Sequence, residues 1–149
     1  MKSHLKTEKG YDFTKKNKVT IWASNFPYID IPDEYFEEIF SHKGQRARNQ
    51  WSSNYQLRFF VPEHLETNGS TEDLIDFERA VGECSFSESF IKPAINKARQ
   101  NNLLKVSWVI LLFDYEYSTK TTGILNDQYT HCIGAFTYDE ESDSVYEVD

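Results

Sequence analysis

Two segments have the hydrophobic patterns that predict the best-defined strands of the chain. In residues 19–23 small apolar residues alternate with Thr20 and Trp22, the period of two that a strand requires. In residues 105–117 both sets of alternate positions are apolar in the middle, which is typical of a central strand covered on both faces. We therefore place Trp22 and Trp108 in the core. Weaker patterns predict three further strands, at residues 57–61, 130–138 and 144–148.

Apolar stripes with helical spacing predict three helices, at residues 32–42, 71–81 and 88–100. The first begins at Pro32, which a first helical turn tolerates, and ends before Gly44. The second follows Ser70, a residue type that caps helix N-termini. The third contains Pro93 too deep for a regular helix, so we expect this helix to start later or to bend there.

The order of these elements predicts an α+β fold, with a mainly antiparallel sheet of about four strands packed against about three helices. Residues 1–18 carry six Lys and few apolar residues, and we expect a basic, partly flexible leader there. Residues 19–149 are expected to form a single domain. Residues 43–69 are mostly without a clear pattern, although Asn68 and Gly69 predict a turn.

The chain of 149 residues is acidic, with 24 Asp and Glu against 16 Lys and Arg and a formal net charge of −8. Nucleic-acid binders need a basic surface for phosphate contacts, so this balance argues against such a partner. The longest strongly apolar run, residues 108–113, is far shorter than the roughly 20 residues of a membrane span. Because no apolar segment follows the basic N-terminus, we expect no signal peptide and a cytoplasmic location. The two cysteines, Cys84 and Cys132, are too few for a disulfide framework and are expected to be buried free thiols.

No catalytic or cofactor-binding motif occurs in the sequence, so no cofactor is expected. The best candidates for chemistry lie on two strands that we expect to pair. Asp114 and Glu116 share one strand face with Cα atoms about 7 Å apart, and His131 and Cys132 could bring further metal ligands. An alternative function is therefore a small metal-dependent hydrolase that uses Asp114, Glu116 and His131. Two solvated carboxylates at the rim of the sheet explain the same pair without any chemistry.

Acidic residues are concentrated between Glu63 and Glu88, where eight carboxylates accompany one arginine. Such a segment is often only a solvated face, but a dense negative patch can also steer a basic partner and fix its orientation. Aromatic rings beside the charges would supply the buried anchors of an interface. We predict a docking surface whose charged members are Asp73, Asp76, Glu83, Glu88, Asp114 and Glu116, with Tyr115 and Tyr117 as anchors and Phe86 and Tyr138 as further candidate rings.

Three blocks carry a family resemblance: residues 19–26 (VTIWASNF), residues 85–91 (SFSESFI) and residues 109–117 (VILLFDYEY). In order and spacing they resemble the opening strand, the serine-and-aromatic segment and the apolar strand of immunity protein family 22 of bacterial polymorphic toxin systems. Ser24 stands where this family commonly has glycine. The resemblance implies an immunity protein that is made beside a toxin domain, binds it and neutralises it by occlusion. Many such toxins are nucleases, which are basic because they bind phosphates.

A second resemblance gives an alternative family. Residues 31–36 (IPDEYF) resemble the Pro-x-x-Tyr helix start of the SUKH superfamily, another immunity fold, but the expected glycine-rich strand with tryptophan does not follow cleanly. Under either resemblance the expected partner is a cognate toxin domain, with a basic nuclease as the expected class, and neither nucleic acid nor a membrane. The oligomeric state is left open by the sequence.

Overall fold

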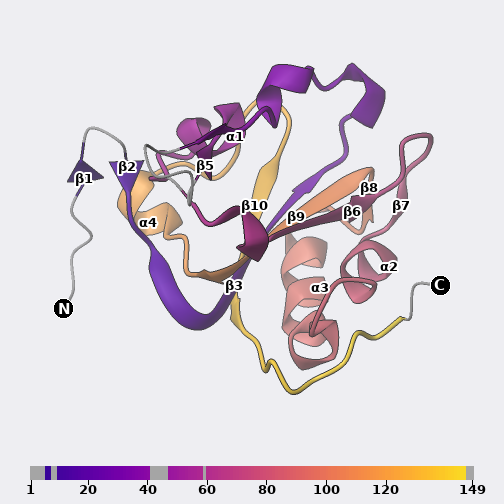
Figure 1. Cartoon of the computed structure of the whole chain (residues 1–149). Coiled ribbons are helices and arrows are strands. Elements are labelled where there is room, and N and C mark those ends of the chain that lie inside the picture. Colours follow the sequence, from indigo (N-terminus) through magenta and orange to yellow (C-terminus); the bar gives the residue numbers. More distant parts are fainter. Residues whose placement is uncertain (1–5, 8–9, 41–46, 59, 147–149) are drawn as a thin grey trace.

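The centre of the molecule is a four-stranded antiparallel sheet with strand order β10–β3–β9–β6 (Figure 1). The structure is a computed structural model that describes residues 6–7, 10–40, 47–58 and 60–146. The strands of the sheet are β3 (Thr14–Ser24), β6 (Leu65–Gly69), β9 (Trp108–Tyr115) and β10 (His131–Thr137). Strand β9 lies inside the sheet, as its two apolar faces predict. The predicted α+β class and its four-stranded antiparallel sheet are confirmed.

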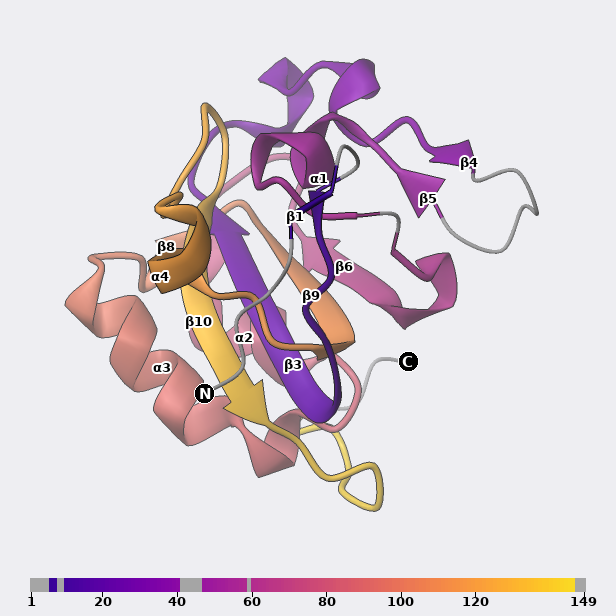
Figure 2. The ribbon, with the colours of Figure 1, turned by 90° about the vertical axis from the view of Figure 1, so that its left-hand side faces the viewer.

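Two helices, α2 (Phe77–Gly82) and α3 (Ile91–Gln100), cover one face of the sheet (Figure 2). Alternate strand residues such as Val19, Ile21 and Leu111 point toward the helices and are fully buried in one cluster with them. This cluster is mostly aliphatic and also contains phenylalanine rings, of which Phe77 and Phe90 are fully buried. We call it the helical layer.

The opposite face of the sheet carries a second core, which we call the aromatic layer. It includes the short helix α1 (Gln50–Asn54), which Figure 2 shows on the other side of the sheet from α2. The ring of Trp22 lies at its centre, with its centroid 4.8 Å from that of Trp51. Trp22 and Trp108 are 0% and 9% exposed, which confirms that both belong to the core. The main rings of the layer are Phe13, Trp22, Tyr35, Trp51, Tyr55, Phe60, Trp108, Tyr115 and Tyr117.

Strand β3 is longer than its pattern predicts, because it begins at Thr14 and not at Val19. The register with β9 shifts between these two residues, and residues 15–18 bulge opposite Asp114. The preceding residue, Phe13, is buried in the aromatic layer. The segment expected to be a leader therefore contributes to both the sheet and the core.

Strand β6 replaces the turn predicted at Asn68 and Gly69. Asn68 pairs with Val109 and Gly69 with Trp108, so both residues belong to the ladder. A side chain at position 69 would collide with the backbone of Ser107 and Trp108, so the glycine serves a close approach of two strands. A glycine chosen for close packing and one chosen for a turn look the same in the sequence.

Two weaker strand predictions are wrong. Residues 57–61 contribute only isolated bridges, at Leu57 and Phe60, and residue 59 lies outside the described residues. Residues 144–146 form no strand, with bends at residues 145 and 146, and residues 147–149 lie outside the described residues. Within the described residues, three two-stranded ladders complete the strands: β1 (Lys6–Thr7) with β2 (Gly10–Tyr11), β4 (Ile39–Phe40) with β5 (Ala47–Arg48), and β7 (Ile75–Asp76) with β8 (Lys105–Val106).

The helix predicted at residues 32–42 is wrong. Its first part is a single 3-10 turn, Asp33–Tyr35, and its end forms β4, while residues 41–46 lie outside the described residues. The hydroxyl of Tyr35 is hydrogen-bonded to Asp127 and Thr130, which fixes the segment against the aromatic layer. Tertiary contacts therefore override a stripe that the local pattern assigns to a helix.

The other two helices are shorter than predicted, and two more were missed. Helix α2 starts at Phe77 because Ser70 accepts the backbone N–H groups of Glu72 and Asp73 in a turn, and β7 follows. Helix α3 starts at Ile91, so Pro93 falls in the first turn, where its missing N–H removes no helical hydrogen bond. The missed helices are α1 and α4 (Thr119–Thr122). In the described part of the chain no helix has the length and apolar character that crossing a bilayer demands.

Candidate functional site

The predicted site residues do not converge on one point of the molecule. Asp114 and Glu116 lie where β9 ends, whereas Asp73 follows β6, whose last residue Gly69 pairs with Trp108 at the start of β9. Strand β9 has eight residues, so these two ends of the sheet are roughly 23 Å apart. Each group therefore has to be judged by its own surroundings.

Asp114 holds the bulge of β3 in place. Its carboxylate accepts a hydrogen bond from the backbone N–H of Asn17 at 3.0 Å and another from the hydroxyl of Tyr138 at 2.6 Å. Asp114 and Asn17 have φ angles of 59° and 67°, in the left-handed region that Asp and Asn tolerate better than most residues. Burial and the carboxylate of Asp114 raise the pKa of Tyr138, which keeps its hydroxyl a donor. Asp114 is thus a structural residue of the sheet.

Glu116 lies between two lysines of the same bulge. The Nζ atoms of Lys15 and Lys18 are 3.6 Å and 3.5 Å from its carboxylate oxygens. Exposed pairs of this kind add little stability, but they cancel the negative charge that would attract a basic partner. The rings expected beside it as anchors, Tyr115 and Tyr117, are each 5% exposed and belong to the aromatic layer. An interruption of strand alternation at Asp114, whose φ angle is 59°, accounts for this correction. Regular alternation would put Tyr115 on the same face as Leu111 and Phe113 in the helical layer, but the ring lies in the aromatic layer with Ile110 and Leu112.

The residues of the alternative hydrolase do not share a site. His131 pairs with Ala23, which pairs in turn with Val109, and Asp114 lies five residues further along β9, roughly 16 Å away. Burial lowers the pKa of His131 and raises the pKa of the Cys132 thiol to about 12, so this cysteine holds its proton at neutral pH. Among the described residues no group of three or more His, Cys, Asp or Glu could hold a metal ion. The hydrolase hypothesis therefore has no geometric basis.

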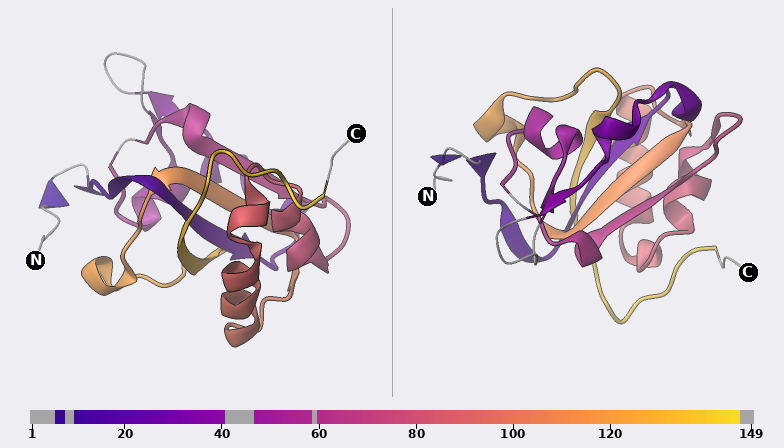
Figure 3. Two further views of the ribbon diagram at one scale, coloured as in Figure 1. Left: turned by 90° about the horizontal axis from the view of Figure 1, so that it is seen from below. Right: turned by 45° about the horizontal axis from the view of Figure 1, so that its top comes forward.

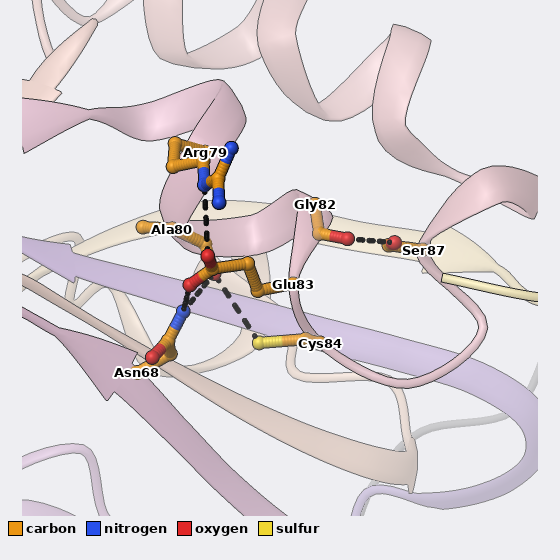
Figure 4. A network of polar contacts seen from close by, with 7 residues as sticks. All are labelled: Asn68, Arg79, Ala80, Gly82, Glu83, Cys84 and Ser87. Carbon is orange, nitrogen blue, oxygen red and sulfur yellow. Dashed lines mark hydrogen bonds and ion pairs between the residues drawn. The ribbon is translucent and has the colours of Figure 1, made fainter. Parts of the chain in front are cut away.

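Glu83 connects α2 to the sheet (Figure 4). Its carboxylate accepts hydrogen bonds from Nδ2 of Asn68 at 2.9 Å and from Nε of Arg79 at 2.8 Å. The amide of Asn68, followed by Arg79, lowers the pKa of Glu83 because both stabilise the charged form. Asp76 is likewise paired, 2.7 Å from Nζ of Lys105 across the β7–β8 ladder. Both predicted docking residues therefore already have partners within the chain.

Unpaired negative charge gathers where the C-terminal segment, residues 139–146, runs along residues 82–89. Hydrogen bonds join the two segments, including those from Glu88 N to Asp143 O at 3.0 Å and from Tyr146 N to Gly82 O at 3.0 Å. Within the described residues no ion pair involves the carboxylates on this surface. We call it the acidic ridge, and its exposed carboxylates are Glu88, Asp139, Glu140, Glu141 and Asp143.

A second acidic surface was not predicted, and it surrounds exposed apolar side chains. Ile29 and Tyr28 are 82% and 38% exposed, and Asp33 and Glu72 line the same hollow. A signal for it was present in the sequence, because residues 19–42 contain five Asp and Glu and no Lys or Arg. The apolar pattern of residues 32–42 predicts a buried helical stripe, and that helix does not form. Asp73 is exposed on the loop that carries Glu72.

Comparison with known proteins identifies one family. The family model described as "Immunity protein 22" matches residues 19–139, which is more than half of the chain. No curated protein and no solved structure matches the sequence. The matched residues include the whole four-stranded sheet except the first residues of β3, together with both helices of the helical layer. The chain therefore belongs to the immunity protein 22 family.

Proposed function

We propose that this chain binds and neutralises a cognate toxin domain, that the toxin is a basic nuclease, and that the chain inhibits it by occlusion. Family membership is the observation that carries the proposal, since an immunity protein implies a toxin as its partner and a non-enzymatic, inhibitory role. The nature of the toxin and the way it is blocked are inferred from the charge and shape of the described surface.

Charge supports a basic partner. Residues 19–149 hold ten Lys and Arg and 22 Asp and Glu, and the carboxylates of the acidic ridge have no cationic partner among the described residues. A nuclease needs a basic surface to hold phosphates. A negative surface steers such a partner into contact, and covering the phosphate-binding surface would exclude the nucleic acid.

The proposed place of action is the cytoplasm, where a toxic nuclease would meet its substrate. The state of the cysteines agrees with a reducing compartment, because Cys84 and Cys132 are both free and buried. Burial raises the pKa of both thiols, which protects them from chemical modification.

The test uses the toxin domain encoded beside the gene of this chain. That domain is expressed in bacterial cells with and without the chain, and both proteins are purified for a nuclease assay. We expect survival only with the chain, a one-to-one complex, and stoichiometric loss of nuclease activity. The association rate should fall as salt rises, because the steering charges are exposed. Cells that die although the chain is present and folded would contradict the proposal, and an unrelated protein of equal net charge serves as the control.

A further inference from the structure

We infer that the hollow between residues 28–36 and residues 71–72 is the anchor site for the toxin, where it receives an apolar or aromatic side chain flanked by Lys or Arg. The inference rests on the proposed function and deepens it by naming the surface and the chemistry of the contact. We call this hollow the acidic groove. It has a volume of about 520 Å³ and is lined by Tyr28, Ile29, Ile31, Pro32, Asp33, Phe36, Thr71 and Glu72.

The acidic groove lies at the end of the sheet where β9 begins. One wall comes from the segment between β3 and β4, and the other from the loop between β6 and β7. Figure 3 shows these two connections at the same end of the sheet. Because β6 and β3 both pair with β9, the sheet itself sets the separation of the two walls.

The wall beside Trp108 is rigid. The ring centroids of Phe36 and Tyr28 lie 4.2 Å and 5.3 Å from that of Trp108, and both contacts are edge-to-face. Tyr35, next to Phe36, is held in place because its hydroxyl donates a hydrogen bond to Asp127 and is also hydrogen-bonded to the hydroxyl of Thr130. A site built on rings that are already fixed loses little conformational entropy when a partner binds.

The floor and near rim of the acidic groove expose apolar surface that nothing in the described chain covers. Ile29 is 82% exposed and Tyr28 is 38% exposed, although large apolar side chains are normally buried. Clusters of this kind, surrounded by polar residues, mark interaction sites. Exposed aromatic and aliphatic residues are also the kind that anchor protein interfaces.

The rim selects the charge of the partner. Asp33 and Glu72 line the groove, and Asp30, Glu34 and Asp73 are exposed next to them in the sequence. None of the five makes an ion pair within the described residues. Residues 19–42 and residues 59–78 contain no Lys or Arg. The groove therefore attracts a cationic surface and repels an anionic one, including a second copy of this chain.

A larger hollow of about 920 Å³ lies beside β10, but it gives no such preference. Its lining mixes Lys97 and Lys120 with Glu116, and Glu116 is already paired with lysines of β3. This mixed-charge hollow offers no consistent charge to either an acidic or a basic partner. Its exposed Leu125 provides a matched control for Ile29, since the two are 54% and 82% exposed.

The experiment measures binding of the purified toxin domain encoded beside this chain's gene. We expect Ile29→Asp to weaken Kd about 30-fold or more, as for a central interface residue, and Leu125→Asp to change it less than threefold. The double variant Asp33→Lys with Glu72→Lys should slow association about tenfold or more. Its control, Glu140→Lys with Asp143→Lys on the acidic ridge, changes the net charge equally and should slow association only about threefold.

All the substituted residues are exposed. We therefore expect each variant to unfold at the same temperature as the wild-type chain. If the wild-type chain binds the toxin domain and the Kd of Ile29→Asp is within threefold of the wild-type value, the acidic groove is not the anchor site. The proposed function would not be affected by that result. If the wild-type chain does not bind the toxin domain, both the proposed function and the assignment of the acidic groove are contradicted. Equal slowing by the two charge-reversal pairs would overturn the role of the groove rim.

Discussion

The two layers of this protein cover the same sheet but are held together by different forces. The helical layer is a continuous cluster of aliphatic side chains and phenylalanine rings, whose packing is largely non-directional. The aromatic layer combines large rings with a network of hydroxyl and carboxylate hydrogen bonds. Such bonds have defined directions, so they can position irregular segments that no regular helix supports.

Asp127 is the centre of that network. Its carboxylate accepts hydrogen bonds from the side chains of Tyr35 and Asn54 and from the backbone N–H groups of Tyr129 and Thr130. The hydroxyl of Tyr55 reaches the carbonyl oxygen of Thr130 at 3.0 Å. The helical layer therefore supplies bulk burial, while the aromatic layer also shapes the surface at the acidic groove.

The largest effect should come from the central ring of the aromatic layer. We expect Trp22→Ala to lower the free energy of unfolding by about 3–5 kcal/mol, because the ring is fully buried between Trp51, Tyr55 and Tyr117. Urea denaturation measures the loss. Ile21→Val, on the helical side of the same strand, should cost only about 0.5–1.5 kcal/mol.

Trp22→Phe provides a sharper control for this prediction. The Nε1 of Trp22 is buried without a hydrogen-bond partner among the described residues, so its removal recovers the cost of an unpaired donor. The phenylalanine variant should therefore lose much less stability than the alanine variant. Equal losses in the two variants would show that the packing of the ring is not what matters.

The network itself should give the next largest effect. Asp127→Ala removes one acceptor from several donors at once, and we expect a loss of about 2–3 kcal/mol. Asp139→Ala, an exposed carboxylate, should change stability by no more than about 0.5 kcal/mol. A loss at Asp127 no larger than at Asp139 would mean that packing alone positions the loop.

Alkaline pH should weaken the aromatic layer first. Burial raises the pKa of Tyr117 to about 12, against about 10 in an unfolded chain. The contribution of the Tyr117 hydroxyl to the free energy of unfolding is complete below pH 10. It is lost as the pH rises toward 12, because in that range only the unfolded chain releases the proton of this hydroxyl. Tyr117→Phe should therefore show a smaller loss of stability between pH 9 and 12 than the wild-type chain. Ile21→Val, which removes no ionisable group, should keep the wild-type slope.

The smallest effect is expected on the helical side, at Glu83. Asn68 and Arg79 lower the pKa of Glu83. The stabilisation that its charged carboxylate provides is therefore present above the unfolded pKa near 4.5 and is lost as the pH falls through the lowered pKa of the folded state. Glu83→Gln should cost about 0.5–1 kcal/mol at pH 7 and less at pH 3. Denaturation at both pH values checks this, and an equal cost at both would contradict it.

The parts of the fold that follow from the sequence are those where local pattern and burial agree. Strand β9 could be predicted because both its faces are apolar, and α3 because its stripe ends in basic residues and its proline marks the true start. The helix at residues 32–42 could not be excluded, since its stripe is real but Tyr35 and Phe36 contact Tyr129 and Trp108 instead. These partners, together with Asp127 and Thr130, which bind the hydroxyl of Tyr35, are distant in the sequence and leave no local signal.

The candidate site shows the same division. The acidic character of the surface could be predicted, but the assignment of single residues could not, because an ion pair depends on which lysines the fold brings near. Glu116 and Asp76 meet lysines from other strands, and Asp114 meets a backbone N–H of a bulge. Ile29 lies between the strand predicted at residues 19–23 and the helix predicted at residues 32–42, so no periodic pattern indicates its exposure.

Hydrogen–deuterium exchange of the chain, alone and bound to the toxin domain encoded beside its gene, shows whether the toxin covers the acidic groove. We predict slower exchange on binding in residues 28–36 and 70–74, which form the acidic groove and its rim, and unchanged exchange in α3 of the helical layer. Slowing confined to α3 and β10, with no change at the acidic groove, would contradict binding of the toxin at the groove.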